Sequence, residues 1–326
     1  MILQVNQKLT FKNNNVRGLE PYIVNTKNSL GFRGEEPPKD IENKLSVITI
    51  GGSTTACLYL SDGKDWPNIL AQKLKVKFPG IWLNNAGFDG HSTFGHQILL
   101  DDYILKLKPK YVLFLVGIND VERESNYLVA SGCAKNYSDS LGWKAKLVEH
   151  LEVASLVHNL YLVYLAKSKS VTHFNLDLEN VETLQMSEPE IETELIKQKK
   201  YLGNYGIRIQ GLINTCRKNK IEPVFITQPL LFGNCIDPVT KKDLGKIKFN
   251  NTRNGLAEWQ ILELYNDVTR NTCRQKNVLY IDLAQKMPKN SAFFYDGMHF
   301  TNSGAAMVAK IIETDLNPFL VQNKLH

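Results

Sequence analysis

A carboxylate and an imidazole lie close together near the end of this chain, in the tetrapeptide Asp296-Gly297-Met298-His299. A carboxylate three residues before a histidine can hold the imidazole in one tautomer, so the pair could act as a general base. Such a base needs a nucleophile. Ser53 is the best candidate, because it follows an apolar run that breaks at two glycines, as a strand does when a turn presents a hydroxyl at the edge of a sheet.

Two further apolar runs end in polar residues, at 81–90 and 111–120. The first ends in Asn-Ala-Gly-Phe-Asp-Gly and the second in Gly-Ile-Asn-Asp. In an open parallel sheet, ligands bind beyond the carboxyl ends of the strands. We therefore expect both segments to lie near Ser53 and His299.

These four segments together resemble a known family. The ordered set of Gly-Gly-Ser-Thr at 51–54, Asn-Ala-Gly-Phe-Asp-Gly at 85–90, Gly-Ile-Asn-Asp at 117–120 and Asp-Gly-Met-His at 296–299 resembles the four blocks of the SGNH (GDSL-type) hydrolases. The resemblance implies that Ser53 attacks an ester, His299 takes its proton and Asp296 orients the imidazole. One departure is that Gly52 stands where the family commonly has aspartate, which bears on substrate type and loop rigidity.

The resemblance also implies an oxyanion hole. Its donors would be the backbone N–H groups of Ser53 and Gly90 and the side-chain amide of Asn119. Gly87 is the alternative to Gly90, which we prefer because it is the final glycine of its block.

Three more residues are candidates for the pocket. Arg33 lies in the segment 28–34, which resembles one that precedes the serine block in some envelope-associated or glycan-modifying SGNH-like proteins. We expect Arg33 chiefly to fasten the N-terminal arm by surface hydrogen bonds. His91 follows the second block, and Gln228 closes the fourth predicted strand.

Each of these residues also has an ordinary structural explanation. Ser53 could be a helix N-cap, Asn119 could belong to a turn, and His299 could lie on the surface. Four such coincidences in the family's order, each at a strand end or before a helix, favour the catalytic interpretation.

The spacing of the apolar runs predicts an α/β fold. Strands are expected at 46–50, 81–85, 111–116, 223–228 and 278–282, and helices at about 64–77, 94–106, 197–219, 256–276 and 302–313. Five apolar strands separated by helices indicate a parallel sheet covered on both faces. The resemblance implies a flavodoxin-like three-layer α/β/α sandwich with strand order 2-1-3-4-5.

The chain divides into an arm, a hydrolase domain and an insertion. Residues 1–44 are polar and are expected to form an irregular N-terminal arm packed on the core, and residues 45–326 the SGNH hydrolase domain. The third and fourth strands are too far apart for one crossover helix, so residues 121–196 are predicted to form a largely helical insertion that acts as a lid or substrate wall.

The composition of the chain limits the classes of partner and cofactor that we expect. Of 326 residues, 43% are hydrophobic, and the net charge of +6 is scattered along the chain without an arginine-rich stripe, which disfavours a nucleic-acid partner. The five cysteines show no metal-ligand spacing, and no metal or cofactor is expected. Without a leader or a membrane-spanning segment, we expect a soluble chain. Its compartment stays open between the cytoplasm and, for a chain trimmed of a signal or anchor, the cell envelope.

We predict a serine esterase that removes a short, acetyl-like acyl group from a carbohydrate through an acyl-serine intermediate. A glycan O-acyltransferase is the nearest alternative, because a sugar hydroxyl can resolve the same intermediate in place of water. An inactive SGNH-fold binding protein is an alternative of another class. A nucleotide-binding module is disfavoured, because residues 51–55 lack the dinucleotide-binding glycine spacing and a P-loop lysine.

Overall fold

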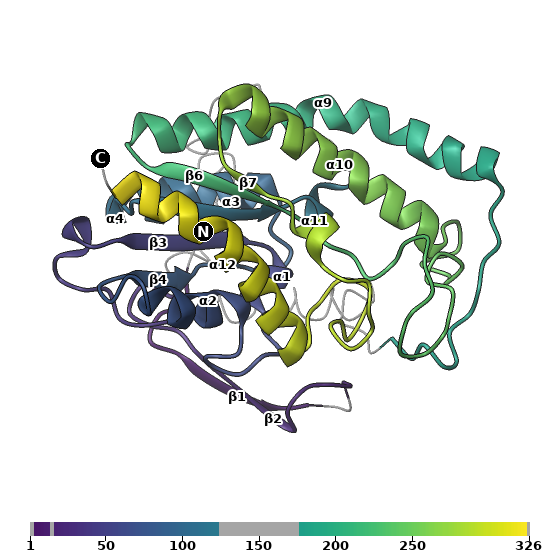
Figure 1. Ribbon diagram of the computed structural model, residues 1–326, viewed down its shortest axis with the longest axis horizontal. Coiled ribbons are helices and arrows are strands. Elements are labelled where there is room, and N and C mark those ends of the chain that lie inside the picture. The colour runs from purple at the N-terminus through teal and green to yellow at the C-terminus, as the bar shows by residue number, and fades with distance from the viewer. Residues whose placement is uncertain (1–2, 14–15, 124–175, 325–326) are drawn as a thin grey trace, which may run out of the picture. The chain divides into compact units, whose positions relative to one another are not determined.

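A parallel sheet of five strands forms the centre of the fold in the computed structural model, which describes residues 3–13, 16–123 and 176–324 (Figure 1). The strands lie in the order β4-β3-β5-β6-β7, which is 2-1-3-4-5 in chain order. Their bounds are β3 (Ser46–Gly51), β4 (Trp82–Asn85), β5 (Tyr111–Val116), β6 (Glu222–Thr227) and β7 (Tyr280–Ile281). The predicted α/β sandwich is confirmed.

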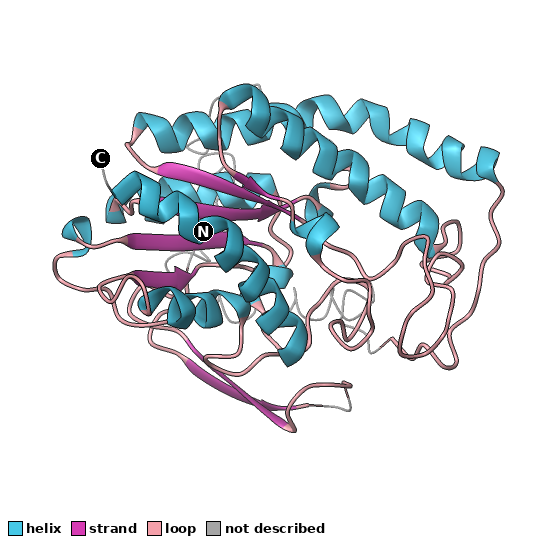
Figure 2. Cartoon of the chain, in the orientation of Figure 1, coloured by secondary structure: helices cyan, strands magenta, loops and turns pink. Residues whose placement is uncertain are grey.

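Both faces of the sheet are buried. Successive side chains of a strand point to opposite faces, so alternate residues of one strand pack on opposite sides of the sheet. In β5, Leu113 and Leu115 pack in one apolar cluster, and Val112 and Phe114 pack in the other. Buried residues of helices α2 (Trp66–Lys75) and α12 (Asn302–Lys324) join the first cluster, and buried residues of α3 (Thr93–Leu99) and α9 (Glu188–Lys218) join the second. The sheet is therefore the middle of three layers (Figure 2).

The helices of these layers follow the strands along the chain, and the last two come after β7. Their bounds are α1 (Ser53–Ala56), α2 (Trp66–Lys75), α3 (Thr93–Leu99), a π-helical turn η2 (Leu100–Ile104), α4 (Leu105–Leu107), α9 (Glu188–Lys218), α10 (Gly255–Lys276), α11 (Leu283–Lys286) and α12 (Asn302–Lys324). The described residues also form two 3-10 turns, η1 (Ile41–Asn43) and η3 (Ile118–Asp120).

The N-terminal arm contains a hairpin that the sequence does not predict. Strands β1 (Lys8–Lys12) and β2 (Tyr22–Thr26) pair antiparallel, apart from the main sheet. Four of the five β1 residues are exposed, so no buried face marks this strand in the sequence. The arm then reaches the main sheet, where the backbone of Arg33 pairs with that of Asn85 at the end of β4.

Two helices are longer than predicted. Helix α9 begins at Glu188, nine residues before the expected start, because Ser187 and Glu190 form a capping box at its N-terminus. Helix α12 continues past residue 313 and through Pro318, and its last turns are held by the buried side chains of Leu316 and Leu320. The central part of the predicted insertion, residues 124–175, lies outside the described residues, and its role as a lid stays a prediction.

Candidate active site

Ser53, His299 and Asp296 are joined in one hydrogen-bonded chain. The Nε2 atom of His299 lies 2.7 Å from Oγ of Ser53, and its Nδ1 lies 2.6 Å from Oδ2 of Asp296. Ser53 and His299 are partly buried, and 246 residues separate them in sequence. The sequence-predicted nucleophile, base and orienting carboxylate therefore meet at one point.

The Asp296 carboxylate is fixed by the turn that carries it. Its Oδ1 accepts hydrogen bonds from the backbone N–H groups of Met298 and His299, at 2.8 and 2.7 Å, which leaves Oδ2 for the imidazole. Burial raises the pKa of this carboxyl, but the hydrogen bonds from His299 and the backbone outweigh that effect and leave the pKa below its usual value. Asp296 is therefore ionised beside the imidazole near neutral pH.

Ser53 is the first residue of α1, a helix of only four residues whose carbonyl groups are bound by side chains from elsewhere. Trp66 Nε1 donates to the carbonyl of Thr54, and Asn85 Nδ2 donates to that of Thr55. Arg33 Nη1 donates to the carbonyls of Ala56 and Cys57, at 2.8 and 2.9 Å. Because the last carbonyls of a helix lack partners within it, these contacts hold α1 in place.

Asn119 lies against Gly52, the residue before Ser53. A Cβ atom added to Gly52 would stand 2.2 Å from Asn119 Nδ2. The same amide donates a 3.0 Å hydrogen bond to the carbonyl of His91. Glycine at position 52, where the hydrolases that the sequence resembles commonly have aspartate, therefore leaves room for the Asn119 amide beside Ser53.

A second group of contacts fixes η3, which carries Asn119. The buried Asp120 carboxylate accepts hydrogen bonds from the backbone and hydroxyl groups of Thr93 and from Arg208 on α9. Thr93 is the first residue of α3, directly after the loop with Gly90 and His91. This network therefore ties η3 to that loop.

Gly87 and Gly90 have different surroundings. The N–H of Gly87 donates to Asn85 Oδ1, and an added Cβ there would stand 2.3 Å from the backbone N of Ala56. Gly90 is exposed, has a φ of +72° and has open space where a Cβ would lie. Among the described residues, the backbone N–H of Gly90 and that of Ser53 have no hydrogen-bond acceptor. These contacts support Gly90 over Gly87 as an available donor.

Residues 49–307 match the family described as GDSL-like Lipase/Acylhydrolase. The match covers more than half of the chain and contains all four sequence blocks. This chain belongs to the GDSL-like lipase/acylhydrolase family. It is accordingly an SGNH/GDSL-type serine hydrolase that acts on esters, as its sequence predicts.

Solved structures similar to this GDSL-like hydrolase have low sequence identity. Axe2, an acetylxylan esterase from Geobacillus stearothermophilus, is 15% identical with a TM-score of 0.47, over 84% of this chain and 94% of that one. A putative lipolytic protein of the G-D-S-L family from Desulfitobacterium hafniense DCB-2 is 13% identical with a TM-score of 0.45, over 83% and 98% of the two chains. No curated protein sequence matches this chain.

A very small pocket lies beside Ser53 in this GDSL-like hydrolase. Its volume is about 10 Å³, which is close to the space for one water molecule. It is lined by Ser53, Thr54, Cys57, Tyr59, Leu60, Tyr295, His299 and Phe300. Sequence analysis misses the aromatic wall of this pocket, although Tyr295 directly precedes Asp296 and is the one signal that could have indicated it.

The three predicted pocket residues do not line this space. The Arg33 guanidinium is buried behind α1, where it also lies 3.3 Å from the buried Asp65 carboxylate, so the expectation of surface hydrogen bonds is wrong. Gln228 is buried and accepts a hydrogen bond from the hydroxyl of Thr54, so it helps to hold α1 in place. The His91 ring packs against that of Phe88, with the centroids 4.6 Å apart and the planes tilted by 33°.

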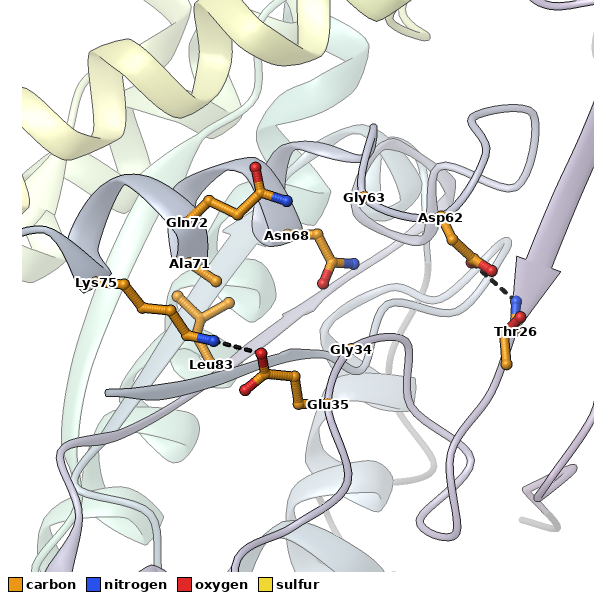
Figure 3. Close-up of a pocket in the computed structure, with 10 residues that line it drawn as sticks. All are labelled: Thr26, Gly34, Glu35, Asp62, Gly63, Asn68, Ala71, Gln72, Lys75 and Leu83. Carbon is orange, nitrogen blue, oxygen red and sulfur yellow. Dashed lines mark hydrogen bonds and ion pairs between the residues drawn. The ribbon is translucent and has the colours of Figure 1, made fainter. Parts of the chain in front are cut away.

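A larger pocket of about 430 Å³ lies away from these groups, between the arm and α2 (Figure 3). Glu35 of the arm and Lys75 of α2 form an ion pair across it, and Asp62 accepts a hydrogen bond from the backbone of Thr26 (Figure 3). Neither Ser53 nor His299 contributes to its lining. Pocket size alone would therefore point away from the hydrogen-bonded serine.

The described residues contain no group of three or more His, Cys, Asp or Glu side chains arranged to hold a metal ion. The cysteines at 57, 216, 235 and 273 are free thiols. Across 3–13, 16–123 and 176–324, no helix combines the length and apolar character required to cross a membrane.

Proposed function

We propose that this hydrolase removes a short, acetyl-like acyl group from a carbohydrate ester, with Ser53 as nucleophile, His299 as general base and Asp296 as the group that orients the imidazole. The observation that carries the proposal is the pair of short contacts on the two imidazole nitrogens, 2.7 Å to Ser53 and 2.6 Å to Asp296. A serine hydroxyl is a weak nucleophile until such a base receives its proton.

The reaction proceeds in two halves. The Ser53 oxygen attacks the ester carbonyl while His299 Nε2 takes the hydroxyl proton, and the imidazolium then gives that proton to the leaving alcohol. Water attacks the resulting acyl-serine, again with His299 as base, and the acid and free Ser53 are released. The ionised Asp296 stabilises the imidazolium that forms in each half.

The negative charge that develops on the ester's carbonyl oxygen during the attack needs hydrogen-bond donors to stabilise it. The backbone N–H groups of Ser53 and Gly90 and the Asn119 amide are the proposed donors. One amide proton of Asn119 is directed to the His91 carbonyl, so the second is available to an oxyanion. The network of Asp120 supports this assignment, because it ties the Asn119 turn to the Gly90 loop.

The preference for a short acyl group is supported by the small pocket beside Ser53. A space of about 10 Å³ bounded by Tyr59, Leu60 and Tyr295 suits a methyl group and would exclude a long chain. The carbohydrate part of the proposal rests on the arm segment 28–34, whose sequence resembles that of glycan-modifying relatives.

The proposal is tested with esters of increasing acyl length. Purified wild type, Ser53→Ala and the control Ser187→Ala are assayed with p-nitrophenyl acetate, butyrate and octanoate and with acetylated xylan fragments. Ser187 is an exposed serine at the N-terminus of α9 and does not line the pocket beside Ser53, so its variant should match the wild-type rate. We expect the rate to fall steeply beyond acetate and to be lost in Ser53→Ala. Faster cleavage of octanoate than of acetate would refute the short-acyl assignment.

The same assay separates hydrolysis from acyl transfer. With an unacetylated xylan acceptor present, a hydrolase releases acetate in proportion to the ester consumed. An acceptor that gains the acetyl group at the expense of free acetate would replace the esterase assignment by the transferase.

A further inference from the structure

The segment after β6 packs directly on the turn that carries the proposed base. The N–H of Leu231 donates a 2.8 Å hydrogen bond to the carbonyl of Gly297. The Phe232 ring lies so close to Gly297 that a Cβ added there would stand 2.6 Å from Cε2 of the ring. Gly297 follows Asp296 and lies two residues before His299, so movement of this segment would move the imidazole.

One ammonium group holds this segment from the other side. Lys289 Nζ donates to the carbonyl of Leu230 at 3.0 Å and also to that of Phe232. These carbonyls flank Leu231, the residue that binds Gly297. The stem of Lys289 lies against Gly233, and its Nζ stands 5.1 Å from the centroid of the Trp259 ring. Lys289 therefore fastens the backbone on both sides of the Leu231 contact.

We propose that Lys289 is a positioning residue for His299, acting through Leu231, Phe232 and Gly297. The inference rests on the proposed role of His299 as base and adds a residue outside the four family blocks. Lys289 lies seven residues before Asp296 and does not line the small pocket beside Ser53. Its effect is therefore on the geometry of the base and not on contact with the ester.

The surroundings of Lys289 make this support sensitive to pH. Lys289 also faces a pocket of about 520 Å³, whose other titratable lining residues are Cys235 and Glu263. Burial lowers the pKa of Lys289 to about 8, against smaller opposing effects of Cys235 and Glu263. A neutral amine donates weaker hydrogen bonds than an ammonium group does. The hold on Leu230 and Phe232 should therefore weaken as the pH rises through about 8.

Stability and activity should change in opposite directions as the pH rises and Lys289 loses its proton. Because the pKa of Lys289 is about 8 in the folded chain and about 10.5 when unfolded, the unfolded chain binds more protons between these values. The contribution of Lys289 to the free energy of unfolding therefore rises with pH in this window. Activity falls in the same window, so an alkaline loss of activity would not reflect unfolding.

The test compares Lys289→Met, Lys289→Arg and the matched control Lys286→Met, with p-nitrophenyl acetate from pH 6 to 10. Lys286 pairs with Asp315 on the exposed side of α11, so its variant loses the same charge away from the proposed base. We expect Lys289→Met to lower kcat about 10- to 100-fold with little change in KM, as a misplaced catalytic group does. Lys289→Arg should restore part of kcat and lack the decline near pH 8, because arginine stays charged.

Hydrogen–deuterium exchange supplies a readout that does not depend on turnover. Lys289→Met should lose protection in peptides covering 229–233 and 294–299, and Lys286→Met should not. Unchanged kcat and unchanged exchange in Lys289→Met would overturn the proposal. A wild type that cleaves no ester, with exchange altered as expected, would instead count against the proposed function and leave the positioning contact standing.

Discussion

The Tyr295 ring lies parallel to the His299 imidazole, with the ring centroids 5.5 Å apart and the planes at 9°. The N–H of Tyr295 also donates a 3.0 Å hydrogen bond to the carbonyl of His299. The Tyr59 ring lies 6.1 Å from that of Tyr295 and packs edge-on against Phe11 of the arm. An aromatic chain therefore runs from the arm to the proposed base and closes the pocket beside Ser53.

Replacement of Tyr295 should change both the rate and the acyl preference. Tyr295→Ala removes the ring that supports the imidazole, so kcat for p-nitrophenyl acetate should fall about 3- to 10-fold, the size of an aromatic-pair contribution. The space left beside Ser53 should raise the ratio of butyrate to acetate hydrolysis. Tyr295→Phe keeps the ring and should keep most of the rate. An unchanged ratio in Tyr295→Ala would mean that Tyr295 does not limit the acyl group.

Restoring a side chain at Gly52 should impair this hydrolase, although the family commonly has aspartate there. An added Cβ would stand 2.2 Å from Asn119 Nδ2 and 3.1 Å from the carbonyl oxygen of His91. Displacement of one oxyanion donor lowers turnover about 10²- to 10³-fold, and we expect that range for Gly52→Ala and Gly52→Asp. Gly80→Ala is the control, because an added Cβ there meets nothing within 4 Å. Full activity in Gly52→Ala would show that the Asn119 amide is not a donor of the oxyanion hole.

Arg33 should matter to folding more than its place in the arm suggests. Its guanidinium binds three carbonyl oxygens and lies 3.3 Å from Asp65, whose side chain is fully buried. Removal of one partner from such a pair costs about 3–5 kcal/mol, so Arg33→Met should lower the free energy of unfolding by that amount. Lys75→Met removes an exposed ion pair with Glu35 and should cost under about 1 kcal/mol. Urea denaturation of both variants measures the difference, and equal costs would contradict the account.

His96 should make the fold sensitive to acid. Burial lowers the pKa of His96 to about 3, because its ring is almost completely removed from solvent. Between pH 6.5 and about 3, the unfolded chain therefore binds a proton that the folded chain does not, and stability falls as the pH falls. His96→Leu should lack this loss, so its advantage over wild type in the free energy of unfolding should grow by about 1.4 kcal/mol per pH unit. Parallel stability curves for the two proteins would show that His96 is not the group responsible.

Much of the fold could be predicted from sequence because its strands are buried on both faces. A strand such as 111–116 is then a continuous apolar run, which stands out against the polar loops around it. The hairpin of β1 and β2 lacks this signal, since most β1 side chains are exposed. The start of α9 depends on the Ser187 capping box, and that motif lies before the apolar periodicity begins.

Part of the candidate site could likewise be predicted from sequence, and part of it could not. Ser53, Asp296 and His299 lie in short motifs at the ends of buried elements, so their residue types predict that they meet. The roles of Gly52 and Lys289 depend on contacts with residues far away in sequence, Asn119 for the first and Leu230 for the second. Arg33 looked like a surface arginine because nothing in residues 28–34 shows that α1 lies over it. Such contacts follow from tertiary packing, which no local pattern records.

The proposed mechanism depends on Ser53 being a nucleophile that His299 activates. The most direct measurement is mass spectrometry of the protein after reaction with a serine-directed fluorophosphonate, for wild type, Ser53→Ala and His299→Ala. We expect one adduct on the peptide containing Ser53 in wild type, none in Ser53→Ala and a much slower reaction in His299→Ala. Labelling of a different residue, or equal labelling of Ser53 with and without His299, would contradict it.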